Sequence, residues 1–306
     1  MQSCYGIQRA GEWLMASVKE IQDRMRSVQD TRKITNAMYL ISSSKLKKAK
    51  KRLDETTPYF FLLESTIAAI VDHTPRTLEH KYFDQRRDKK VRNEGYLVIT
   101  GDKGLCGAYN QNVIRLAEQH IAENESHSLF VVGEIGRRYF KKKGYHVAGE
   151  FLYTAQKPNI HRSGAISETL LALFEQGYLD DIYLVYTESL SPMVSKPKIL
   201  KVLPLEQHLF EQAKHDRFAQ TTEFSPCPEV VLDRLVPNYV RGLIFGALIS
   251  SFSSEQNSRM MAMNAATKSA DDMLAALSLA YNRARQANIT QEMNEIVGGS
   301  QHFGTE

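Results

Sequence analysis

The sequence has few cysteines, no long unbroken apolar run and no strong excess of either charge. Its three cysteines, Cys4, Cys106 and Cys227, are scattered, odd in number and without metal-ligand spacing, which indicates a reducing compartment. Apolar runs such as residues 243–249 fall well short of the roughly 18 residues that a membrane-spanning helix needs, so we expect any membrane association to be indirect. A net charge of +4, from 39 basic and 35 acidic residues, gives no general case for nucleic-acid binding.

The first residues of the chain lack the features of a signal peptide. They include Arg9 and Glu12 and have no sustained apolar core. After Met15, the residues Ser17 and Glu20 have the spacing of a capping box, in which each side chain bonds the other's backbone amide at a helix start. We therefore predict that the natural protein starts at Met15 and that residues 1–14 are an N-terminal extension.

Helix breakers are nearly absent from both ends of the chain. From Ser17 to about Asp72 the only proline is Pro58, and we predict a helix over residues 15–75, bent at that proline. Apolar residues recur in it at mostly helical intervals, namely Ile21, Met25, Val28, Ile34, Met38 and Ile41. After Pro237 the next breakers are Gly298 and Gly299, so we predict a second helix within residues 226–300.

The C-terminal helix carries a stripe of mostly small residues at steps of four and three. The stripe consists of Ala262, Ala266, Ser269, Met273, Ala276, Ala280, Ala284 and Ala287. Such a seam keeps one side of a helix facing a partner helix. The stripe could instead pack on the chain's own globular core. Because both terminal segments are far longer than the helices of about 11 residues that are typical of globular domains, we expect them to pair as an extended antiparallel rod.

The middle of the chain alternates short apolar strands with helical stretches. We predict strands at 96–100, 129–132 and 182–186, helices near 110–124, 134–142 and 165–176, and an edge strand over 198–205. This βαβ series indicates a largely parallel sheet. The predicted fold class is therefore α/β: a small Rossmann-like domain at residues 90–210, with a long antiparallel coiled coil of N- and C-terminal helices.

A glycine-rich turn at Gly101–Gly107 is the most enzyme-like feature. A turn between a strand and a helix can bind phosphate, because a helix N-terminus offers free amides. However, glycines at 101, 104 and 107 miss the G-x-G-x-x-G spacing, and no Gly-Lys-Ser/Thr follows them. Cys106 could be a nucleophile, but no Cys-His signature accompanies it. We favour a protein-contact loop and a structural cysteine.

Six cations lie within eight residues of the N-terminal helix: Lys45, Lys47, Lys48, Lys50, Lys51 and Arg52. They cover several faces of the helix, so neighbours on the same helix cannot match all of them. This basic face could simply be solvated, or it could contact acidic protein loops. Nucleic acid is less favoured, because the interleaved aromatic residues of a base-stacking surface are absent.

Three separated blocks resemble the gamma subunit of F-type ATP synthases over about residues 15–299. They are Ile34 to Met38, Gly104 to Asn110, and a C-terminal block of three parts running from Ser258 to Glu292. The resemblance implies a non-catalytic rotor subunit without a cofactor. It implies that the paired helices lie inside a hexamer of alpha and beta subunits, with the α/β domain near the epsilon subunit and a proton-driven c-ring. The complex would sit peripherally on the cytoplasmic face of a bacterial membrane.

The resemblance also suggests which residues make contacts. Arg285 and Gln286 match a polar pair that catches a loop of the catalytic subunits, and Met38 matches a rotor methionine facing the same region. Lys103 lies in a second catch segment. The basic face at Lys45 to Arg52 would meet acidic beta-subunit loops. The apolar tip that turns inside the hexamer would consist of Ile289, Met293, Ile296 and Val297.

Some positions depart from the family pattern. Ser225 stands where an acidic residue often precedes the proline, here Pro226, so the ring contacts expected around residues 222–224 do not transfer directly. Asn257 and Ser258 are more polar than usual, and the paired cysteines of photosynthetic relatives are absent. Two other classes stay open on the residues alone. A scaffold or nucleic-acid-binding coiled coil would explain the rods, and a Rossmann-like enzyme would explain the sheet.

Overall fold

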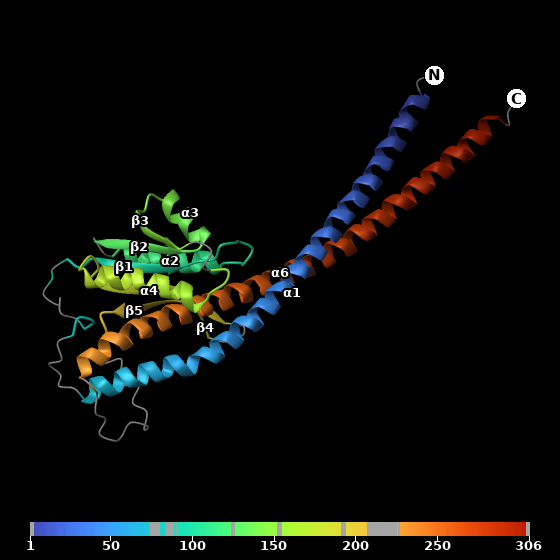
Figure 1. Ribbon diagram of the computed structural model, residues 1–306. Coiled ribbons are helices and arrows are strands. Elements are labelled where there is room, and N and C mark those ends of the chain that lie inside the picture. The colour runs from blue at the N-terminus through green and yellow to red at the C-terminus, as the bar shows by residue number, and fades with distance from the viewer. Residues whose placement is uncertain are drawn as a thin grey trace. The chain divides into compact units, whose positions relative to one another are not determined.

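The computed structural model describes residues 3–73, 80–83, 89, 91–123, 126–151, 155–190, 194–206, 225 and 227–303. It divides into two compact units. Unit 1 comprises Met1–Ile41 and Met261–Glu306, and unit 2 comprises Ser42–Met260. Two long helices, α1 (Ser3–His73) and α6 (Pro228–Phe303), contribute to both units (Figure 1). The predicted terminal helices are thus confirmed.

Each long helix extends beyond its predicted bounds at one end, α1 before residue 15 and α6 past residue 300. Helix α1 begins at Ser3, so Ser17 lies inside it and is not its first capping residue. Whether Met15 is the natural start stays a prediction, and the side chains of residues 1–17 lie outside those described. Helix α6 begins at Pro228, where a first-turn proline is tolerated, and it continues through Pro237 and past Gly298. Pro237 removes one helical hydrogen bond. The buried side chains of Val236 and Val240, which flank it, offset this loss.

A five-stranded mixed sheet forms the middle of unit 2. The strand order is β3-β2-β1-β4-β5; every neighbouring pair is parallel except β4 and β5. The strands are β1 (Glu94–Ile99), β2 (His127–Val132), β3 (Val147–Phe151), β4 (Asp181–Ser189) and β5 (Ser195–Leu203). The α/β class and the edge strand are confirmed, and Pro197 fits β5 because an edge strand tolerates a missing donor.

One strand, β3, was not predicted from the sequence. It is five residues long and contains Gly149 and Glu150, so its apolar signal is weak. Its backbone pairs with β2, and a Cβ at position 149 would lie 2.6 Å from Cδ1 of Phe130. The glycine therefore serves close packing between neighbouring strands, which a single-strand pattern does not reveal.

Helices cover both faces of the sheet. Helices α2 (Tyr109–Ile121) and α3 (Glu134–Lys142) pack on the face that buries Tyr96 and Val98. Helix α4 (Ile160–Glu175) and the unit 2 segments of α1 and α6 pack on the face that buries Leu97 and Ile99. This alternation follows from the two-residue period of a strand, and it explains why β1 reads as a continuous apolar run.

In unit 1, α1 and α6 run antiparallel. The hydroxyls of Thr35 and Thr267 lie 2.8 Å apart, and Arg32 forms an ion pair with Asp271. Moving toward the N-terminus along α1 therefore corresponds to moving toward the C-terminus along α6. The predicted antiparallel coiled coil is confirmed for this unit.

The predicted seam of small residues is only partly right: Ala262, Ala266 and Ala284 are half-buried, but its other members are exposed. Met273, Ala276 and Ala280 are exposed, with Met273 at 52%. Most of the buried or half-buried side chains follow a shifted stripe with the same steps of four and three: Met263, Thr267, Ala270, Leu274, Leu277, Tyr281, Ala284, Asn288 and Gln291. This stripe contains larger apolar side chains, so burying it removes more apolar surface from water than burying the alanines would.

The N-terminal helix shows the same shift. Ile21, Met25 and Val28 are half-buried as the spacing suggested, whereas Ile34 and Ile41 are 61% and 54% exposed. Thr35 occupies the seam in place of Ile34, and its hydroxyl meets that of Thr267. Two isoleucines therefore point outward on the free chain.

Helix α6 also tests the expectation that no segment is long and apolar enough to span a membrane. Within the described residues, it contains the one 18-residue window whose mean hydropathy, 1.3, and length would suit a membrane span, and 56% of that window is buried inside the protein. The expectation that no stretch qualifies is therefore corrected, because averaging joins short apolar runs. The fully buried Leu232, Val236 and Val240 show that this part of α6 acts as a core helix.

The shifted seam makes a direct prediction. Ala270→Asp should lower the unfolding free energy by about 2 kcal/mol more than Ala276→Asp, because only position 270 is buried, at 4% exposure. Both substitutions carry the same loss of helix propensity, so the pair is matched. Thermal unfolding followed by circular dichroism checks this. Equal losses, or a greater loss at position 276, would restore the small-residue seam.

Candidate interaction surfaces

The glycine-rich turn follows the carboxyl end of β1, beside the carboxyl end of β4. The strand order reverses between these two strands, and this is where doubly wound sheets place their ligands. Here α6 lies against that position. The Nη2 atom of Arg259 donates to the carbonyl oxygens of Lys103 at 3.2 Å and Gly104 at 3.0 Å. The turn is thus held from α6 through its backbone.

A buried ion pair supports this contact. Arg259 donates to Glu255 Oε1 at 2.6 Å, one turn earlier on α6, and the two side chains are only 9% and 7% exposed. Because each charge needs the other when water is excluded, the pair fixes the direction of the guanidinium toward the turn. Sequence reasoning quoted Arg259 only within a family block and missed Glu255. An acid and a base four residues apart, in an otherwise weakly charged helix segment, were the available signal.

Serines of α6 bind the neighbouring strand. The Oγ of Ser251 accepts from the backbone N of Thr187 at 3.3 Å, and the Oγ of Ser250 accepts from that of Ser189 at 3.0 Å. These amides lie in the last residues of β4. Helix α6 therefore bonds to the end of β4 as well as to the turn after β1, and its own side chains take the place of a ligand.

The inner part of the turn is tightly bonded. The backbone N of Gly101 donates to Asn110 Oδ1 at 2.8 Å, and Asn110 Nδ2 donates to Cys106 Sγ at 3.2 Å. A Cβ at position 101 would approach Cδ of Glu255 to 3.1 Å. The glycine there permits the close approach of α6.

The outer part of the turn faces outward. Lys103, Gly104 and Leu105 are exposed, and Leu105 is 67% exposed with a φ of 60°. A non-glycine residue in the left-handed region costs free energy and persists only where its surroundings hold it. The turn thus presents one cation and one apolar side chain in a fixed shape, which suits contact with a protein surface.

The donors of the neighbouring helix are already used. At the N-terminus of α3, the backbone N of Glu134 donates to Asp102 Oδ1 at 3.0 Å, and that of Gly136 donates to Thr100 Oγ1 at 3.0 Å. An anion at this end of α3 would have to displace these side chains. The amides at this end of α3 are therefore already bonded, and the outward-facing residues 103–105 favour the contact-loop interpretation.

Cys106 has the surroundings of a structural thiol. Its side chain is buried, and burial raises its pKa, partly opposed by the nearby charge of Arg259. A raised pKa lowers the thiolate fraction at neutral pH, and the thiolate is the reactive form.

We therefore expect Cys106 to alkylate slowly. In a Cys4→Ser/Cys227→Ser variant, iodoacetamide at pH 8 should modify Cys106 at least about tenfold more slowly in the folded chain than in urea, since the thiol is both buried and protonated. Mass spectrometry of quenched samples measures the rate. Comparable rates in the two conditions would contradict the structural role.

The ion pair under the turn gives a second prediction. Arg259→Met should destabilise the chain by about 3–5 kcal/mol, because Glu255 stays buried without its partner. Glu255→Gln in the same chain should recover much of this loss. Arg241→Met is the matched control on the same helix, since Arg241 pairs with the exposed Glu168, and it should cost about 1 kcal/mol or less.

The pH dependence of the variant tests the same pair. Burial raises the pKa of Glu255, while the charge and hydrogen bond of Arg259 lower it. A folded pKa above the unfolded one gives stability that is present below the unfolded pKa and is lost as pH rises through the folded pKa. Arg259→Met should therefore lose more stability between pH 5 and pH 8 than the parent chain does. Urea denaturation at both pH values measures this, and parallel profiles would argue against the pair.

The predicted contact residues of unit 1 lie at two levels of the coiled coil. Met38 is half-buried and lies one turn from the Thr35–Thr267 contact, whereas Arg285 and Gln286 are exposed. Arg285 lies about 27 Å farther along α6 than Thr267, at 1.5 Å per residue. The structure does not bring Met38 together with the polar pair.

The apolar tip predicted at the end of α6 is exposed. Its exposed fractions are 48% for Ile289, 61% for Met293, 72% for Ile296 and 55% for Val297. Exposed apolar side chains in a series of this kind are typical of a surface that another molecule covers. Ile34 and Ile41 on α1, near the level of the Thr35–Thr267 contact, are also exposed and were not predicted as contacts.

The basic face divides into two sides of α1. Lys47, Lys50 and Lys51 lie with Asp54 and Glu55, and Lys51 is 3.8 Å from Glu55. A second group, Lys45, Lys48 and Arg52, faces the segment before α4 and the apolar side of α6. The expectation that neighbours on the helix cannot match all six cations is thus supported. Of the ring-contact region, residues 222–224 lie outside the part of the chain described, and Ser225 is exposed.

Known proteins match nearly the whole chain. A family model described as ATP synthase matches residues 17–302. The ATP synthase gamma chain of Ruminiclostridium cellulolyticum is 45% identical over 93% of this chain and 98% of its own length. A gamma chain described as sodium ion specific, from Acetobacterium woodii, is 37% identical over 93% of this chain and 98% of its own.

The fold is also similar to solved structures. A chain in the OSCP/F1/c-ring structure of Euglena gracilis mitochondrial ATP synthase has a TM-score of 0.67 and 17% identity, covering 95% of this chain and 96% of that one. At this identity the likeness concerns the fold alone. The sequence matches go further, and by them the chain belongs to the family of ATP synthase gamma chains.

Proposed function

We propose that this chain is the central-stalk rotor of an ATP synthase, which couples ion-driven rotation to conformational changes in catalytic subunits and performs no chemistry itself. The observation that carries the proposal is the pair of helices that continue from the sheet domain into an antiparallel coiled coil with exposed contact residues. The family membership supports it.

A rotor must transmit torque from one end to the other. In this chain α1 and α6 are continuous helices that contribute residues to both units. The buried contact of Arg259 with the turn after β1 ties α6 to the sheet. The unit 2 part of α6 is therefore bonded to the domain that would be driven.

Rotation acts on the catalytic subunits through unequal contacts. A partner shifts a conformational equilibrium only when it interacts differently with each state. The asymmetry of this chain provides such differences, since the Arg285–Gln286 pair lies well along α6 from the contact at Met38. We infer that both sites meet loops of beta subunits, and that the exposed turn at Lys103 forms a further contact.

The remaining surfaces suggest the other partners. The apolar tip from Ile289 to Val297 fits an apolar sleeve inside an alpha and beta hexamer, and the basic face fits acidic beta-subunit loops. The structural neighbours come from F1, rotor and c-ring assemblies, which supports the c-ring as a partner, while the epsilon subunit is a partner that the family resemblance implies. The bacterial relatives support a location at the cytoplasmic face of a membrane.

The coupling ion is a property of the ring. One relative, which shares 37% identity with this chain, is described as sodium ion specific. The proton coupling implied by the first resemblance therefore stays a prediction. It can be tested by the sodium dependence of the assembled complex.

The proposal can be tested with two neighbouring arginines of α6. Arg285→Ala should reduce ATP hydrolysis and ATP-driven ion transport by the reconstituted complex several-fold, because a guanidinium forms paired bonds to carboxylates that alanine cannot replace. Arg283→Ala is the matched control, since Arg283 is also exposed on the same turn, and it should keep at least about half of both activities.

Copurification tests the proposal that this chain is a rotor subunit. The chain should copurify with alpha and beta subunits, and their regulated ATP hydrolysis should fall when it is removed. A chain that is absent from the complex in stoichiometric amounts would overturn the rotor proposal. Equal effects of Arg283→Ala and Arg285→Ala would overturn only the assignment of the catch residues.

A further inference from the structure

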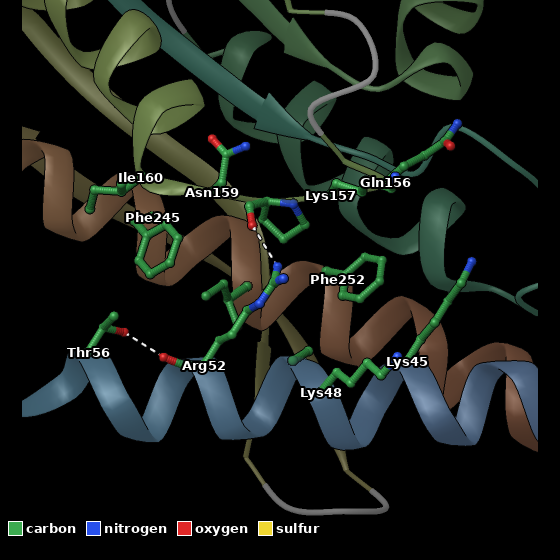
Figure 2. Close-up of a pocket in the computed structure, with 13 residues that line it drawn as sticks. Lys45, Lys48, Arg52, Thr56, Gln156, Lys157, Asn159, Ile160, Phe245 and Phe252 are labelled. Atoms are coloured by element: carbon green, nitrogen blue, oxygen red, sulfur yellow. Dashed lines mark hydrogen bonds between the residues drawn. The ribbon is translucent and has the colours of Figure 1, made fainter.

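A cavity of about 550 Å³ lies between α1, α6 and the segment before α4, all within unit 2 (Figure 2). Helix α1 provides one wall, α6 provides the floor, and residues 156–160 close the opposite side. Its size falls within the range of pockets that hold small organic molecules, about 300–1,000 Å³. The rotor proposal assigns Lys45, Lys48 and Arg52 at its rim to the basic face, but neither that proposal nor the contact-loop argument uses the cavity itself.

The floor of the cavity is apolar. Phe245 and Phe252 project from α6 toward α1, and Ile249 lies between them in sequence. Ala49 faces them from α1 and is 5% exposed. Together with the half-buried Phe60 and Leu53, these residues form a small apolar cluster separate from the two cores around the sheet. Such a surface favours an apolar ring or chain.

The rim of the cavity is cationic. Lys45, Lys48 and Arg52 come from α1, and Lys157 comes from the segment before α4. No acidic side chain is among the residues that line the cavity, and within the described part of the chain Lys45 and Lys48 form no ion pair. Lys45 also acts electrostatically on Glu255, whose pKa burial raises and Lys45 lowers, so Lys48 is the lysine of α1 whose charge is available to a ligand.

Arg52 is placed across the opening. Figure 2 shows its side chain rising from α1 toward the facing segment, where Nη1 lies 3.5 Å from the carbonyl oxygen of Pro158. At this distance the bond to a neutral oxygen is weak. A guanidinium has five N–H donors, so Arg52 can bind an anion while it keeps this contact.

We propose that this cavity binds an amphipathic organic anion, with one carboxylate-like or sulfonate-like head and an apolar chain or ring system. The head would lie among Lys48, Arg52 and Lys157, and the body would cover Phe245 and Phe252. Inorganic phosphate would leave the apolar floor unused, and a neutral apolar molecule would leave the cations unpaired. A bound ligand would bridge α1, α6 and the start of α4.

The probe for this site is 8-anilinonaphthalene-1-sulfonate, an aromatic anion of suitable size, titrated into the full-length chain and followed by fluorescence. Lys48→Gln should weaken its affinity about threefold to fivefold, as expected for loss of one partly exposed charge contact. Lys47→Gln is the matched control, because Lys47 lies on the other side of α1 beside Asp54 and Glu55. It should change the affinity less than about twofold.

Competition by a charged and an uncharged ligand of the same chain length tests whether the negative head contributes to binding. Decanoate should displace the probe at a concentration at least about tenfold lower than 1-decanol, which has the same chain length and no charge. Ala49→Phe, which fills the cavity from α1, should reduce probe binding about tenfold in a chain whose circular dichroism is unchanged. If that variant does not fold, the Lys48 and Lys47 pair decides the question.

Three results would overturn the proposal. They are the absence of saturable probe binding, equal effects of Lys48→Gln and Lys47→Gln, and displacement by 1-decanol as effective as that by decanoate. The last two would mean that the probe binds through apolar contact and not through the cations at this rim. None of these outcomes bears on the rotor proposal, because that proposal depends on copurification and on Arg285.

Discussion

The seating of α6 against the carboxyl ends of β1 and β4 is the contact on which the rest of unit 2 depends. In a doubly wound sheet this crevice usually receives a ligand. Here Arg259 bonds the carbonyls of the turn after β1, and Ser250 and Ser251 bond the last amides of β4. The polar groups that a bound molecule would satisfy are satisfied by the chain itself. In this chain the crevice that binds a small molecule in other doubly wound folds instead holds a helix.

The buried Glu255–Arg259 pair contributes more to the specific placement of α6 on the sheet than to the stability of the fold. Two charges removed from water recover their hydration cost only with good geometry, so the pair favours one placement of the helix over alternatives in which either charge lacks its partner. The same pair shapes the turn that exposes Lys103 and Leu105. Contact between α6 and the sheet therefore also determines what the chain presents to a partner, and mechanical coupling and surface recognition share one set of bonds.

Several features were predicted from the sequence because they depend on local chemistry. The two long helices followed from the scarcity of breakers, the sheet followed from alternating apolar strands, and the failed spacing at Gly101–Gly107 argued against a nucleotide site. Strand β3 was missed, because Gly149 is explained only by the ring of Phe130 on the next strand. The start of α1 was placed too late, at residue 15 instead of Ser3, and Pro237 does not interrupt α6, where the neighbouring Val236 and Val240 are buried.

The sequence by itself determined the class of fold, the antiparallel pairing of its ends and the family to which the chain belongs. It also determined the heptad period of the seam, but two stripes on α6 share that period. Only the tertiary structure decided between them, because the stripe with Met263, Leu274 and Leu277 buries more apolar surface than the alanine stripe does. It alone paired Glu255 with Arg259 beneath the turn and divided the basic face into a side near carboxylates and a side above an apolar cavity. Such pairings join residues far apart in the chain, so no local pattern specifies them.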